Sequence, residues 1–319
     1  MNRIKVLVTG GAGYIGSHLV NYLLNNNYDV TVIDDLSTGT LGRLIKGAEF
    51  IKCDIRDFNK LNLILSSTNF DAIFHLAAKK SVIESVSNST LYESINRFGT
   101  EELVRAANLN AVKNLIFSST CAVYGQNQMQ VVNERSPINP ISPYGHSKYQ
   151  AEKLIFNSYK HNICILRYFN VIGESEIKFR DINQDSLVPS IIKSLTENRK
   201  LQIYGKDYPT KDGTCERDYI DVRDIVSSHV DAYLVMKKFN ESLGVINLGY
   251  GEPKSVLNIV NKVQQIIGKK IDYEFKERRR GDVSIVYSDN SLAKKLINFN
   301  PIFTVDDALE SVFLNQFGS

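Results

Sequence analysis

Residues 6–16 read Val-Leu-Val-Thr-Gly-Gly-Ala-Gly-Tyr-Ile-Gly, an apolar run followed by glycines at positions 10, 11, 13 and 16. Glycine permits a tight turn after a strand, close approach of the backbone to a pyrophosphate, and close packing of the next helix. The first N–H groups of that helix attract negative charge. A purely structural turn would also use glycine, but the position between a strand and a helix predicts a dinucleotide site at Gly10, Gly13 and Gly16.

A carboxylate supports this interpretation. Asp34 ends the second apolar run, 18 residues beyond Gly16. A carboxylate at this place accepts hydrogen bonds from a ribose 2′-hydroxyl and repels a 2′-phosphate. The predicted cofactor is therefore NAD rather than NADP.

Short apolar runs alternate with helical patterns on both sides of this motif. Strands are expected at Ile4–Thr9, Asp29–Ile33, Phe50–Cys53, Ala72–His75, Leu115–Ser118 and Ile163–Arg167. Helices are expected near Ile15–Asn25, Phe58–Leu65, Leu91–Asn108, Ser147–Tyr159, Val222–Met236 and Val256–Ile267. The alternation predicts an α/β fold, a Rossmann-type doubly wound parallel sheet with a smaller C-terminal α/β substrate-binding region. We assign residues 1–169 to the main part of the NAD-binding domain and 170–319 mainly to the substrate-binding region, with some segments returning to the first domain.

Composition excludes several classes of protein. The 319 residues carry 38 Lys+Arg against 35 Asp+Glu, too small an excess to indicate nucleic-acid binding. No apolar stretch approaches the roughly 18 residues that cross a bilayer, so no membrane association is expected. An apolar strand already begins at Ile4, so no secretory leader is expected. Four cysteines without metal-ligand spacing predict no metal site and free thiols in a reducing, cytoplasmic compartment.

Tyr144 and Lys148 form a candidate acid–base pair. They lie four residues apart at the start of a predicted helix, and therefore on one face of it. A free phenol has a pKa near 10, and lowering it to about 7 requires roughly 4 kcal/mol of phenolate stabilisation. An adjacent ammonium and a positive nicotinamide ring could supply that in a low-dielectric cleft. Such a phenol is a competent base during hydride transfer. Alone, this spacing is usually a solvated helix face.

Thr120 strengthens the pair. It leaves the fifth predicted strand at its carboxyl end, the edge at which ligands bind in this architecture. Its hydroxyl can hydrogen-bond an oxygen whose charge changes during oxidation. Loop capping is the competing explanation, and the position of Thr120 makes it the weaker one.

Further motifs make the chain resemble a known family. Ile203-Tyr-Gly-Lys-Asp-Tyr-Pro-Thr-Lys-Asp-Gly-Thr-Cys-Glu-Arg-Asp-Tyr-Ile220 is the most specific stretch. Leu166-Arg-Tyr-Phe-Asn170, Asn247-Leu-Gly and Arg278-Arg-Arg-Gly-Asp282 accompany it in order. With these motifs the chain resembles the extended short-chain dehydrogenase/reductases, and within them the UDP-glucose 4-epimerase type, from Val6 to about Asp289.

The resemblance implies two sets of binding residues. Those implied to contact NAD are Gly10, Gly13, Tyr14, Ile15, Gly16, Asp34, Asp35, Leu36, Ser37, Asp54, Ile55, Leu76, Ala77, Ala78, Lys80, Asn96, Tyr144, Lys148 and Phe169. Those implied to contact a UDP-hexose are Lys80, Thr120, Tyr144, Asn170, Ser186, Leu187, Gln202, Ile203, Tyr204, Arg217, Arg279, Asp282 and Val286. A guanidinium pairs bidentately with phosphate oxygens, whereas an isolated Arg217 would be interpreted as a surface ion pair.

The resemblance also implies the reaction, the interconversion of UDP-glucose and UDP-galactose through a 4-keto intermediate. Tyr144 takes the 4-hydroxyl proton, NAD takes hydride from carbon 4, and the ketosugar turns over and accepts the hydride on its other face. Lys148 lowers the tyrosine pKa, and Thr120 orients the 4-oxygen. By the same resemblance, the apolar faces of Leu91–Asn108 and Ser147–Tyr159 pair with a second subunit in a homodimer.

The chain departs from the family pattern around the substrate. Thr120 replaces a common serine, Ile95-Asn96 replaces two asparagines, Ile172–Asp185 is atypical, and Ile220-Asp221-Val222 replaces isoleucine-histidine-valine. Ungapped counting from Asp282 places Val286 at the pocket-wall position that is aromatic in glucose-restricted members. Room for a 2-acetamido group, and hence UDP-GlcNAc and UDP-GalNAc as further substrates, is therefore expected.

Three alternatives remain at this point. A 4,6-dehydratase would carry an acidic pair after the threonine, where this chain has Cys121-Ala122. A simple dehydrogenase would exchange its cofactor with solvent. A catalytically idle NAD-binding sensor would not need intact Thr120, Tyr144 and Lys148.

Overall fold

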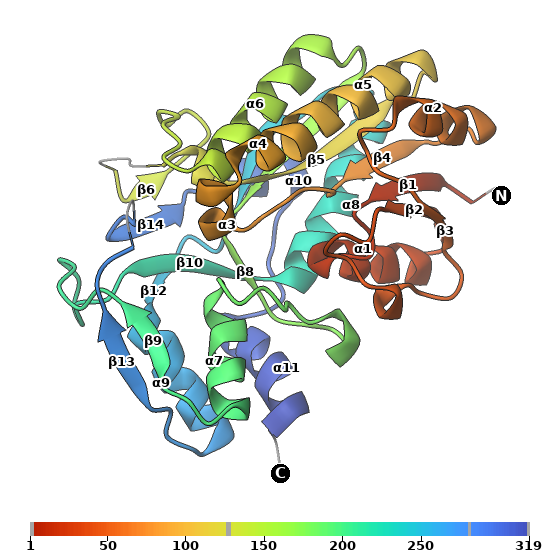
Figure 1. Cartoon of the computed structure of the whole chain (residues 1–319). Helices are drawn as coiled ribbons and strands as arrows, with labels where there is room; N and C mark the ends of the chain where they lie inside the picture. Colours follow the sequence, from red (N-terminus) through yellow and green to blue (C-terminus); the bar gives the residue numbers. More distant parts are fainter. Residues whose placement is uncertain (1–2, 126–128, 280–281, 318–319) are drawn as a thin grey trace.

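Seven parallel strands form the central sheet of the computed structural model, which describes residues 3–125, 129–279 and 282–317 (Figure 1). Across the sheet the strands are Gly244–Leu248 (β11), Asn162–Tyr168 (β7), Asn114–Thr120 (β5), Ala72–His75 (β4), Lys5–Thr9 (β1), Asp29–Asp34 (β2) and Glu49–Lys52 (β3). Each strand expected from the sequence lies within two residues of an observed one, and the expected Rossmann-type sheet is confirmed.

The strand order reverses next to β1. This strand pairs with β2 on one side, Thr9 opposite Ile33, and with β4 on the other, Thr9 opposite His75. The chain therefore leaves β3 at one edge and starts β4 on the far side of β1. In sheets of this kind ligands bind outside the carboxyl ends of the strands where the order reverses.

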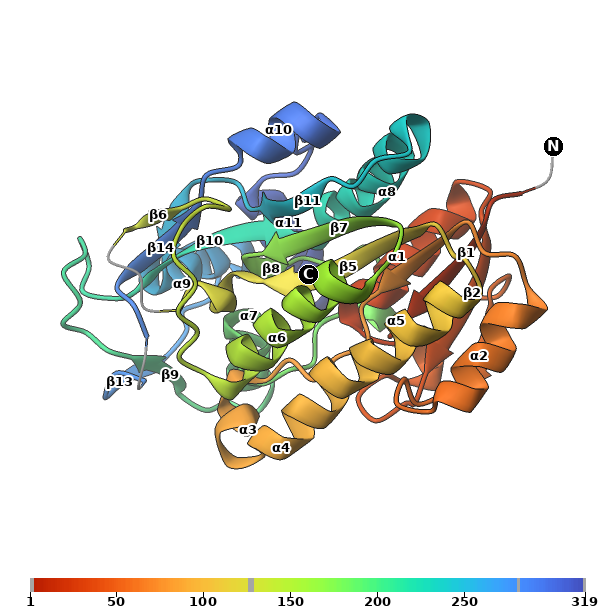
Figure 2. The same ribbon diagram turned by 90° about the horizontal axis from the view of Figure 1, so that it is seen from above.

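Helices cover both faces of the sheet (Figure 2). One face packs against Tyr14–Asn25 (α1), Val222–Phe239 (α8) and Ser291–Ile297 (α10), and the other against Phe58–Ser67 (α2), Gly99–Leu109 (α5) and Pro143–Ser158 (α6). Neighbouring residues of β1 serve different cores: Val8 packs with Leu19 of α1, whereas Leu7 packs with Leu103 of α5. Burial of both faces explains why the strands read as continuous apolar runs.

The helix expected over Leu91–Asn108 contains an unforeseen irregularity. It begins as Ser89–Tyr92 (α4), passes through a π-helical turn at Glu93–Phe98, and continues as α5. Asn96 in this turn is buried, accepts a hydrogen bond from Lys79 N at 2.8 Å and donates to Lys79 O at 3.0 Å. Single π-helical turns occur frequently at functional sites. Here the turn carries the amide that holds the chain just beyond β4.

The second half of the chain builds a smaller layer beside the carboxyl ends of the sheet. Glu216–Asp221 (β10) pairs with Pro253–Ser255 (β12), Ile285–Ser288 (β14) and Asn170–Ile172 (β8), and β14 pairs with Val131–Val132 (β6). Leu201–Tyr204 (β9) pairs with Tyr273–Lys276 (β13), and Leu187–Thr196 (α7), Val256–Ile267 (α9) and Val305–Phe317 (α11) enclose a separate apolar core. The short helix Val82–Ser87 (α3) faces this layer from the first half.

The two halves exchange segments. Strand β11 and helix α8 belong to the second half of the sequence but complete the central sheet and one of its faces, whereas β6 of the first half joins β14. The carboxyl ends of the strands therefore face a layer that is tied to them by several chain crossings. Within the described residues no helix has the length and apolar character needed to cross a membrane.

Burial of His229 in α8 makes the stability of the protein depend on pH. The ring is fully buried, with Nδ1 2.8 Å from Ile225 O and Nε2 2.5 Å from Tyr168 Oη, and burial lowers its pKa to about 4. Its folded pKa lies below the unfolded value near 6.5, so the unfolded chain binds the extra proton and stability falls as pH decreases through this window. The contribution of His229 should lower the free energy of unfolding by about 2 kcal/mol between pH 7 and pH 5.

Replacing His229 by Gln tests this point by urea unfolding at both pH values. The decline in unfolding free energy from pH 7 to pH 5 should be about 2 kcal/mol smaller in His229→Gln than in the parent protein. Comparing declines rather than absolute values cancels the contribution of every other titrating group. An identical decline in the two proteins would contradict burial of a neutral imidazole.

Candidate active site

The glycine turn between β1 and α1 leaves an open anion site. Gly13 precedes the first turn of α1, which has no side-chain cap and no acidic residue. A Cβ on Gly13 would meet only Gly10 O, at 3.2 Å, so the space outside the turn is free. Gly10 itself has φ +72°, and a Cβ there would meet Ala77 N at 2.6 Å. Free N–H groups, a positive helix end and an open approach fit the diphosphate of NAD.

Asp34, at the end of β2, is hydrogen-bonded to the backbone of the same turn. Its Oδ2 accepts from Ala12 N at 3.0 Å and its Oδ1 from Leu36 N at 2.8 Å. Burial raises the pKa of Asp34, and these two backbone bonds oppose that rise. The carboxylate therefore fixes the glycine turn and keeps lone pairs available for a ribose hydroxyl. This arrangement fits NAD.

A small cavity of about 80 Å³ lies over these groups. The predicted residues that line it are Gly10, Gly13, Asp34, Asp35, Ser37, Asp54, Ile55, Leu76, Ala77 and Ala78, and sequence reasoning missed Thr38, Cys53, Lys79 and Ile95. The missed residues are immediate neighbours of predicted ones along the chain.

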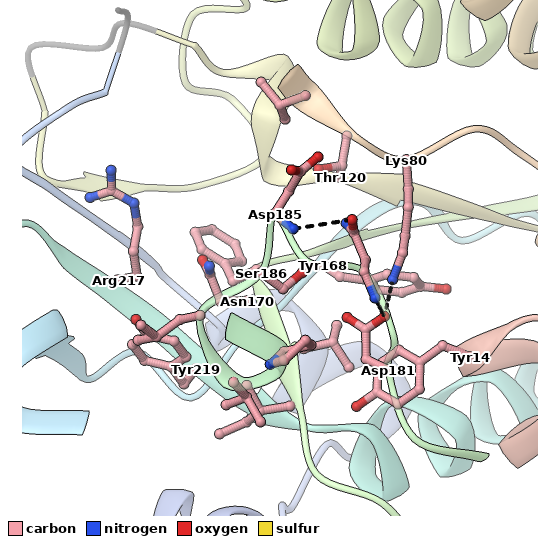
Figure 3. A pocket seen from close by; sticks show the side chains of 18 of the residues that line it. Tyr14, Lys80, Thr120, Tyr168, Asn170, Asp181, Asp185, Ser186, Arg217 and Tyr219 are labelled. Atoms are coloured by element: carbon pink, nitrogen blue, oxygen red, sulfur yellow. Dashed lines mark hydrogen bonds and ion pairs between the residues drawn. The ribbon is translucent and has the colours of Figure 1, made fainter. Parts of the chain in front are cut away.

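A much larger cavity, of about 900 Å³, adjoins the first along two chain segments. Its predicted lining residues are Tyr14, Ile15, Lys80, Thr120, Tyr144, Phe169, Asn170, Ser186, Leu187, Tyr204, Arg217, Arg279 and Asp282. Gly13 lines the small cavity and Tyr14 the large one. In the same way, Ala78 lines the small cavity and Lys80 the large one. Figure 3 shows Tyr14, Lys80, Thr120 and Arg217 around this space. Its volume is that of a site for a ligand of several rings.

Thr120 and Tyr144 meet because two chain segments approach unusually closely. Thr120 ends β5 and accepts from Ala122 N at 3.1 Å, which begins the 3₁₀ turn Cys121–Val123. Tyr144 is in the first turn of α6, which Ser142 caps by accepting from Gly145 N at 3.1 Å. A Cβ on Gly145 would lie 2.6 Å from Ala122 O. Glycine at 145 therefore lets the start of α6 reach the end of β5.

Burial dominates the electrostatics of the pair. It raises the pKa of Tyr144 to about 12, against a hydrogen bond with Thr120 that lowers it. It also lowers the pKa of Lys148 to about 7, against the charge of Glu152, which raises it. The predicted lowering of the tyrosine pKa is thus not achieved by the protein's own groups. A positive charge brought to the phenol is needed in addition.

Aromatic rings contact both Lys148 and Tyr144. Lys148 is 3% exposed, and its Nζ is 4.1 Å from the centroid of the Phe117 ring in β5. The ring of Tyr144 meets that of Tyr92 edge-on, with centroids 6.3 Å apart. The lysine is therefore buried against the central sheet, whereas Tyr144 lines the large cavity.

The arginines that line the large cavity include an N–H donor without a hydrogen-bond partner among the described residues. Arg279 Nε is buried without a hydrogen-bond partner among the described residues, and its guanidinium lies 4.1 Å from the centroid of the Tyr204 ring. Arg217 Nη2 contacts Asp282 Oδ1 at 3.3 Å. Arg280 and Gly281, part of the motif that suggested these groups, lie outside the described residues. Unused guanidinium donors favour an anionic ligand.

Seven predicted residues line neither cavity. Gly16 packs α1 against Gly10, Leu36 positions Asp34, and Asn96 and Lys148 support the site from beneath. The remaining three belong to the substrate set: Gln202 accepts from Tyr204 Oη at 3.1 Å, Ile203 is in the core, and Val286 packs near Phe169.

Acidic and apolar residues that sequence reasoning missed also line the large cavity. Asp181 binds Lys80 Nζ at 2.7 Å (Figure 3). Glu174 is buried, and burial raises its pKa to about 7. On α3, Val82 and Ile83 face the cavity. The sequence signal for Glu174 and Asp181 is that Ile172–Asp185 departs from the family pattern, whereas Val82 and Ile83 had no such signal.

Comparison with known proteins agrees with this geometry. Residues 6–249 match the model of the NAD dependent epimerase/dehydratase family. The chain is 38% identical to UDP-glucose 4-epimerase of Lactobacillus helveticus over 97% of this chain and 96% of that one. It is also 38% identical to putative UDP-arabinose 4-epimerase 2 of Arabidopsis thaliana, over 92% of this chain and 75% of that one.

A solved structure shares the whole architecture. UDP-glucose-4-epimerase from Stenotrophomonas maltophila, solved with bound NAD and formylated UDP-arabinopyranose, superposes with a TM-score of 0.93 at 30% identity. The match covers 98% of this chain and 97% of that one.

Asp34→Asn tests the role of the carboxylate in cofactor choice. The variant keeps the side-chain size but loses the charge, so we expect the NAD dissociation constant to rise about tenfold, which is roughly 1.4 kcal/mol. The preference for NAD over NADP should fall, because a 2′-phosphate is no longer repelled. Titration calorimetry on cofactor-depleted protein measures both affinities. Asp29→Asn, at the exposed start of the same strand, is the control, and equal effects of the two changes would refute the assignment.

Proposed function

The chain belongs to the NAD dependent epimerase/dehydratase family, and we propose that it is a UDP-sugar 4-epimerase in which Tyr144 moves the proton. The enzyme is an NAD-dependent isomerase that interconverts UDP-glucose and UDP-galactose through a 4-keto intermediate. One observation carries the proposal. Thr120 and Tyr144 face a cavity that adjoins the dinucleotide turn on one side and contains Arg217 and Arg279 on the other.

The cofactor would occupy the small cavity and the adjoining wall of the large one. Gly13 and the first N–H groups of α1 would hold the diphosphate, and Asp34 would hold a ribose. When bound, NAD accepts a hydride from the sugar and returns it, and its positive ring adds the charge that the tyrosine lacks. Asn96 fixes the backbone of Lys79 and so the position of Lys80, which faces the substrate cavity.

The proton is handled by residues of the chain. Tyr144 Oη removes it from the sugar 4-hydroxyl and later returns it to the keto oxygen. Thr120 Oγ1 accepts from Ala122 N and hydrogen-bonds Tyr144 in the structure, and its O–H would donate to the 4-oxygen when the sugar is bound. The Lys148 ammonium, one turn along α6 from Tyr144, would stabilise the phenolate once the proton has moved.

The diphosphate of the substrate is the proposed anchor. Arg180, Arg217 and Arg279 line the cavity; Arg180 is engaged by Glu174 and Gln316, whereas the unpaired Arg279 Nε supplies a donor that no protein group uses among the described residues. Tyr204, stacked on Arg279, offers an aromatic face for a base. An anchor on the diphosphate leaves the sugar ring free to turn over, which epimerisation at one carbon requires.

Val286 bears on the size of the sugar. It is opposite Arg217 in the pairing of β14 with β10, and it packs beside Phe169 rather than lining the cavity. A small aliphatic side chain at this place leaves space that an aromatic ring would fill. We therefore propose that a 2-acetamido group is accepted.

The rival activities are less well supported. After Thr120 the chain forms a 3₁₀ turn of Cys121, Ala122 and Val123, so the acidic pair of a dehydratase is absent there. An idle sensor would not need a phenol and a hydroxyl held together by the close approach of Gly145 to Ala122.

We also propose a cytoplasmic homodimer with its domain division at about residue 170. Phe98 is 51% exposed in the π-helical turn and Phe156 is 47% exposed on α6, and α5 and α6 lie side by side on the outer face (Figure 2). Two such helices from each subunit could bury this apolar surface. The four cysteines are all unpaired, which supports a reducing compartment.

Tyr144→Phe tests the proton transfer. Loss of the hydroxyl should lower kcat by about 10³-fold, within the range for removal of an acid–base group, while thermal stability and bound NAD are retained. Tyr159→Phe is the matched control, because it removes a buried hydroxyl that donates to Val112 O at 2.6 Å at the other end of α6. Normal turnover by the Tyr144 variant would show that another group moves the proton.

Product analysis by NMR tests the substrate range. Incubation with UDP-galactose, UDP-N-acetylgalactosamine and UDP-arabinose should convert the first two to their 4-epimers, and the third measures whether the ring substituent at carbon 5 is needed. Failure with every UDP-sugar would refute the proposed function. Failure with the N-acetyl sugar alone would refute only the role assigned to Val286.

Phe98→Glu tests the homodimer. A carboxylate placed in an apolar helix contact should convert the protein to a monomer in light scattering, because burying an unpaired charge is costly. Phe239→Glu, at the exposed end of α8, should leave the assembly unchanged. A monomeric parent protein, or a dimer that survives Phe98→Glu, would exclude this surface.

A further inference from the structure

A buried ion pair lies directly behind the active site. Arg167 Nη2 contacts Glu152 Oε2 at 2.6 Å, and Arg167 Nε donates to Glu152 Oε1 at 3.0 Å. The two side chains are 4% and 2% exposed. Isolating two charges from water costs several kcal/mol per ion unless the geometry is excellent, so such a pair is not explained by stability alone.

The pair joins the elements that carry the catalytic groups. Glu152 is two turns beyond Tyr144 and one turn beyond Lys148 on α6, and Arg167 is in β7. In the sheet Arg167 is opposite Ser119, and Ser119 Oγ donates to Glu152 Oε1 at 2.5 Å. Thr120 is the next residue. One carboxylate therefore ties the end of β5, the face of α6 and β7 together.

The hydrogen-bonded cluster extends from Arg167 to β11 and to Glu134, which follows β6. Arg167 Nη1 donates to Tyr124 Oη at 3.0 Å, and Tyr124 Oη donates to Asn247 Oδ1 at 2.6 Å. Asn247 N in turn donates to Glu134 Oε1 at 2.7 Å. Every polar group of the ion pair thus has a partner, which is the condition under which a buried network holds one geometry.

Glu152 also acts on Lys148 through its charge. Burial lowers the pKa of Lys148 to about 7, and Glu152 opposes that change. Two ionisable groups interact electrostatically with this lysine, Glu152 one turn along the same helix and His75 on β4. Cys121 and Tyr92 are neighbours of Tyr144, and Arg167 is paired with Glu152. His75 is held neutral by burial, with its pKa lowered to about 3. Glu152 is thus the carboxylate placed to keep the lysine charged.

We propose that Glu152 is a positioning residue of the epimerase, whose carboxylate both fixes Ser119, and hence Thr120, against α6 and keeps Lys148 in its ammonium form. The proposal rests on the proposed function of Tyr144 and Lys148. Glu152 lines neither cavity, so it would act on the reaction only through the residues that it holds, Ser119 and Lys148.

The charge and the geometry can be separated by two substitutions. Glu152→Gln keeps the length and an acceptor oxygen but removes the charge, whereas Glu152→Asp keeps the charge and withdraws the oxygen from Ser119. In the first variant the alkaline limb of the kcat profile should move down by about one pH unit or more, since a nearby charge is lost from a low-dielectric site. In the second the limb should stay in place while kcat falls at least about tenfold, because Thr120 loses its support.

A direct titration of Lys148 gives a readout that does not depend on turnover. Competitive acetylation by acetic anhydride, followed by peptide mass spectrometry across pH, reports loss of the ammonium proton. Half-maximal reactivity should shift to lower pH in Glu152→Gln and remain at the parent value in Glu152→Asp. If the parent protein epimerises no UDP-sugar but this shift occurs, the proposed function fails and the electrostatic role of Glu152 stands.

Asp221→Asn is the matched control. Asp221 is another buried carboxylate paired with an arginine, with Arg223 Nη2 at 2.7 Å, but it lies at the start of α8. Its loss should lower stability and leave the Lys148 titration unchanged. Where Glu152→Gln does not fold because Arg167 is left unpaired, Arg167→Met tests the same charge from the other side, because it leaves the Glu152 carboxylate without its counter-charge and should shift the Lys148 titration to higher pH. An unchanged Lys148 titration in the charge-removing variant, or an equal shift in Asp221→Asn, would overturn the proposal.

Discussion

The seven parallel strands of the central sheet end at one edge, and a side chain that leaves that edge has no further strand pairing to hold it. Thr120 is the last residue of β5 and pairs with Tyr168 of β7 alone. It is held further by the 3₁₀ turn that follows it, by the close approach of Gly145 to Ala122, and by Ser119, which is hydrogen-bonded to Glu152. The precision of the site therefore depends on contacts between α6 and the ends of β5 and β7. The same constraint explains why the buried polar groups Ser119, Glu152 and Arg167 meet at this place.

Burial shifts the pKa values of Tyr144 and Lys148 in opposite directions, and each shift disfavours the charged form of its group. It raises the pKa of Tyr144 to about 12 and lowers that of Lys148 to about 7, so each group is pushed toward its neutral form. Neutral groups can coexist in a dry site, whereas the proposed mechanism needs a phenolate and an ammonium together. The balance must be restored by charges from outside the pair. Glu152 supplies one from the protein, and the nicotinamide ring of NAD supplies the other when it binds.

The sequence was sufficient for the parts of the molecule that local patterns control. The glycine turn, Asp34 at the end of β2 and the six expected strands depend on residue type and periodicity within short windows. The division of Tyr14 and Lys80 toward one cavity and Gly13 toward the other also follows from their order along the chain. The family motifs added the arginines, which no local pattern distinguishes from surface residues.

The remaining features depend on contacts between distant segments. The π-helical turn that places Asn96 on Lys79 has no signal in helical periodicity, and the partner of Glu152 is known only once β7 is beside β5. The rise in the pKa of Tyr144 in the absence of the cofactor also had no sequence signal, because burial could not be weighed against charge before the packing was known. Sequence reasoning thus predicted the reacting groups, and the structure shows what holds them.

The central claim is that one proton and one hydride leave and return to the same sugar carbon and its oxygen within a closed site. Incubation of the protein with UDP-galactose in D₂O, followed by proton NMR, tests it most directly. The claim predicts that UDP-glucose accumulates to equilibrium with hydrogen, not deuterium, at carbon 4, because the hydride returns without exchanging with solvent. Deuterium at carbon 4, or release of a ketosugar without formation of the epimer, would contradict the account.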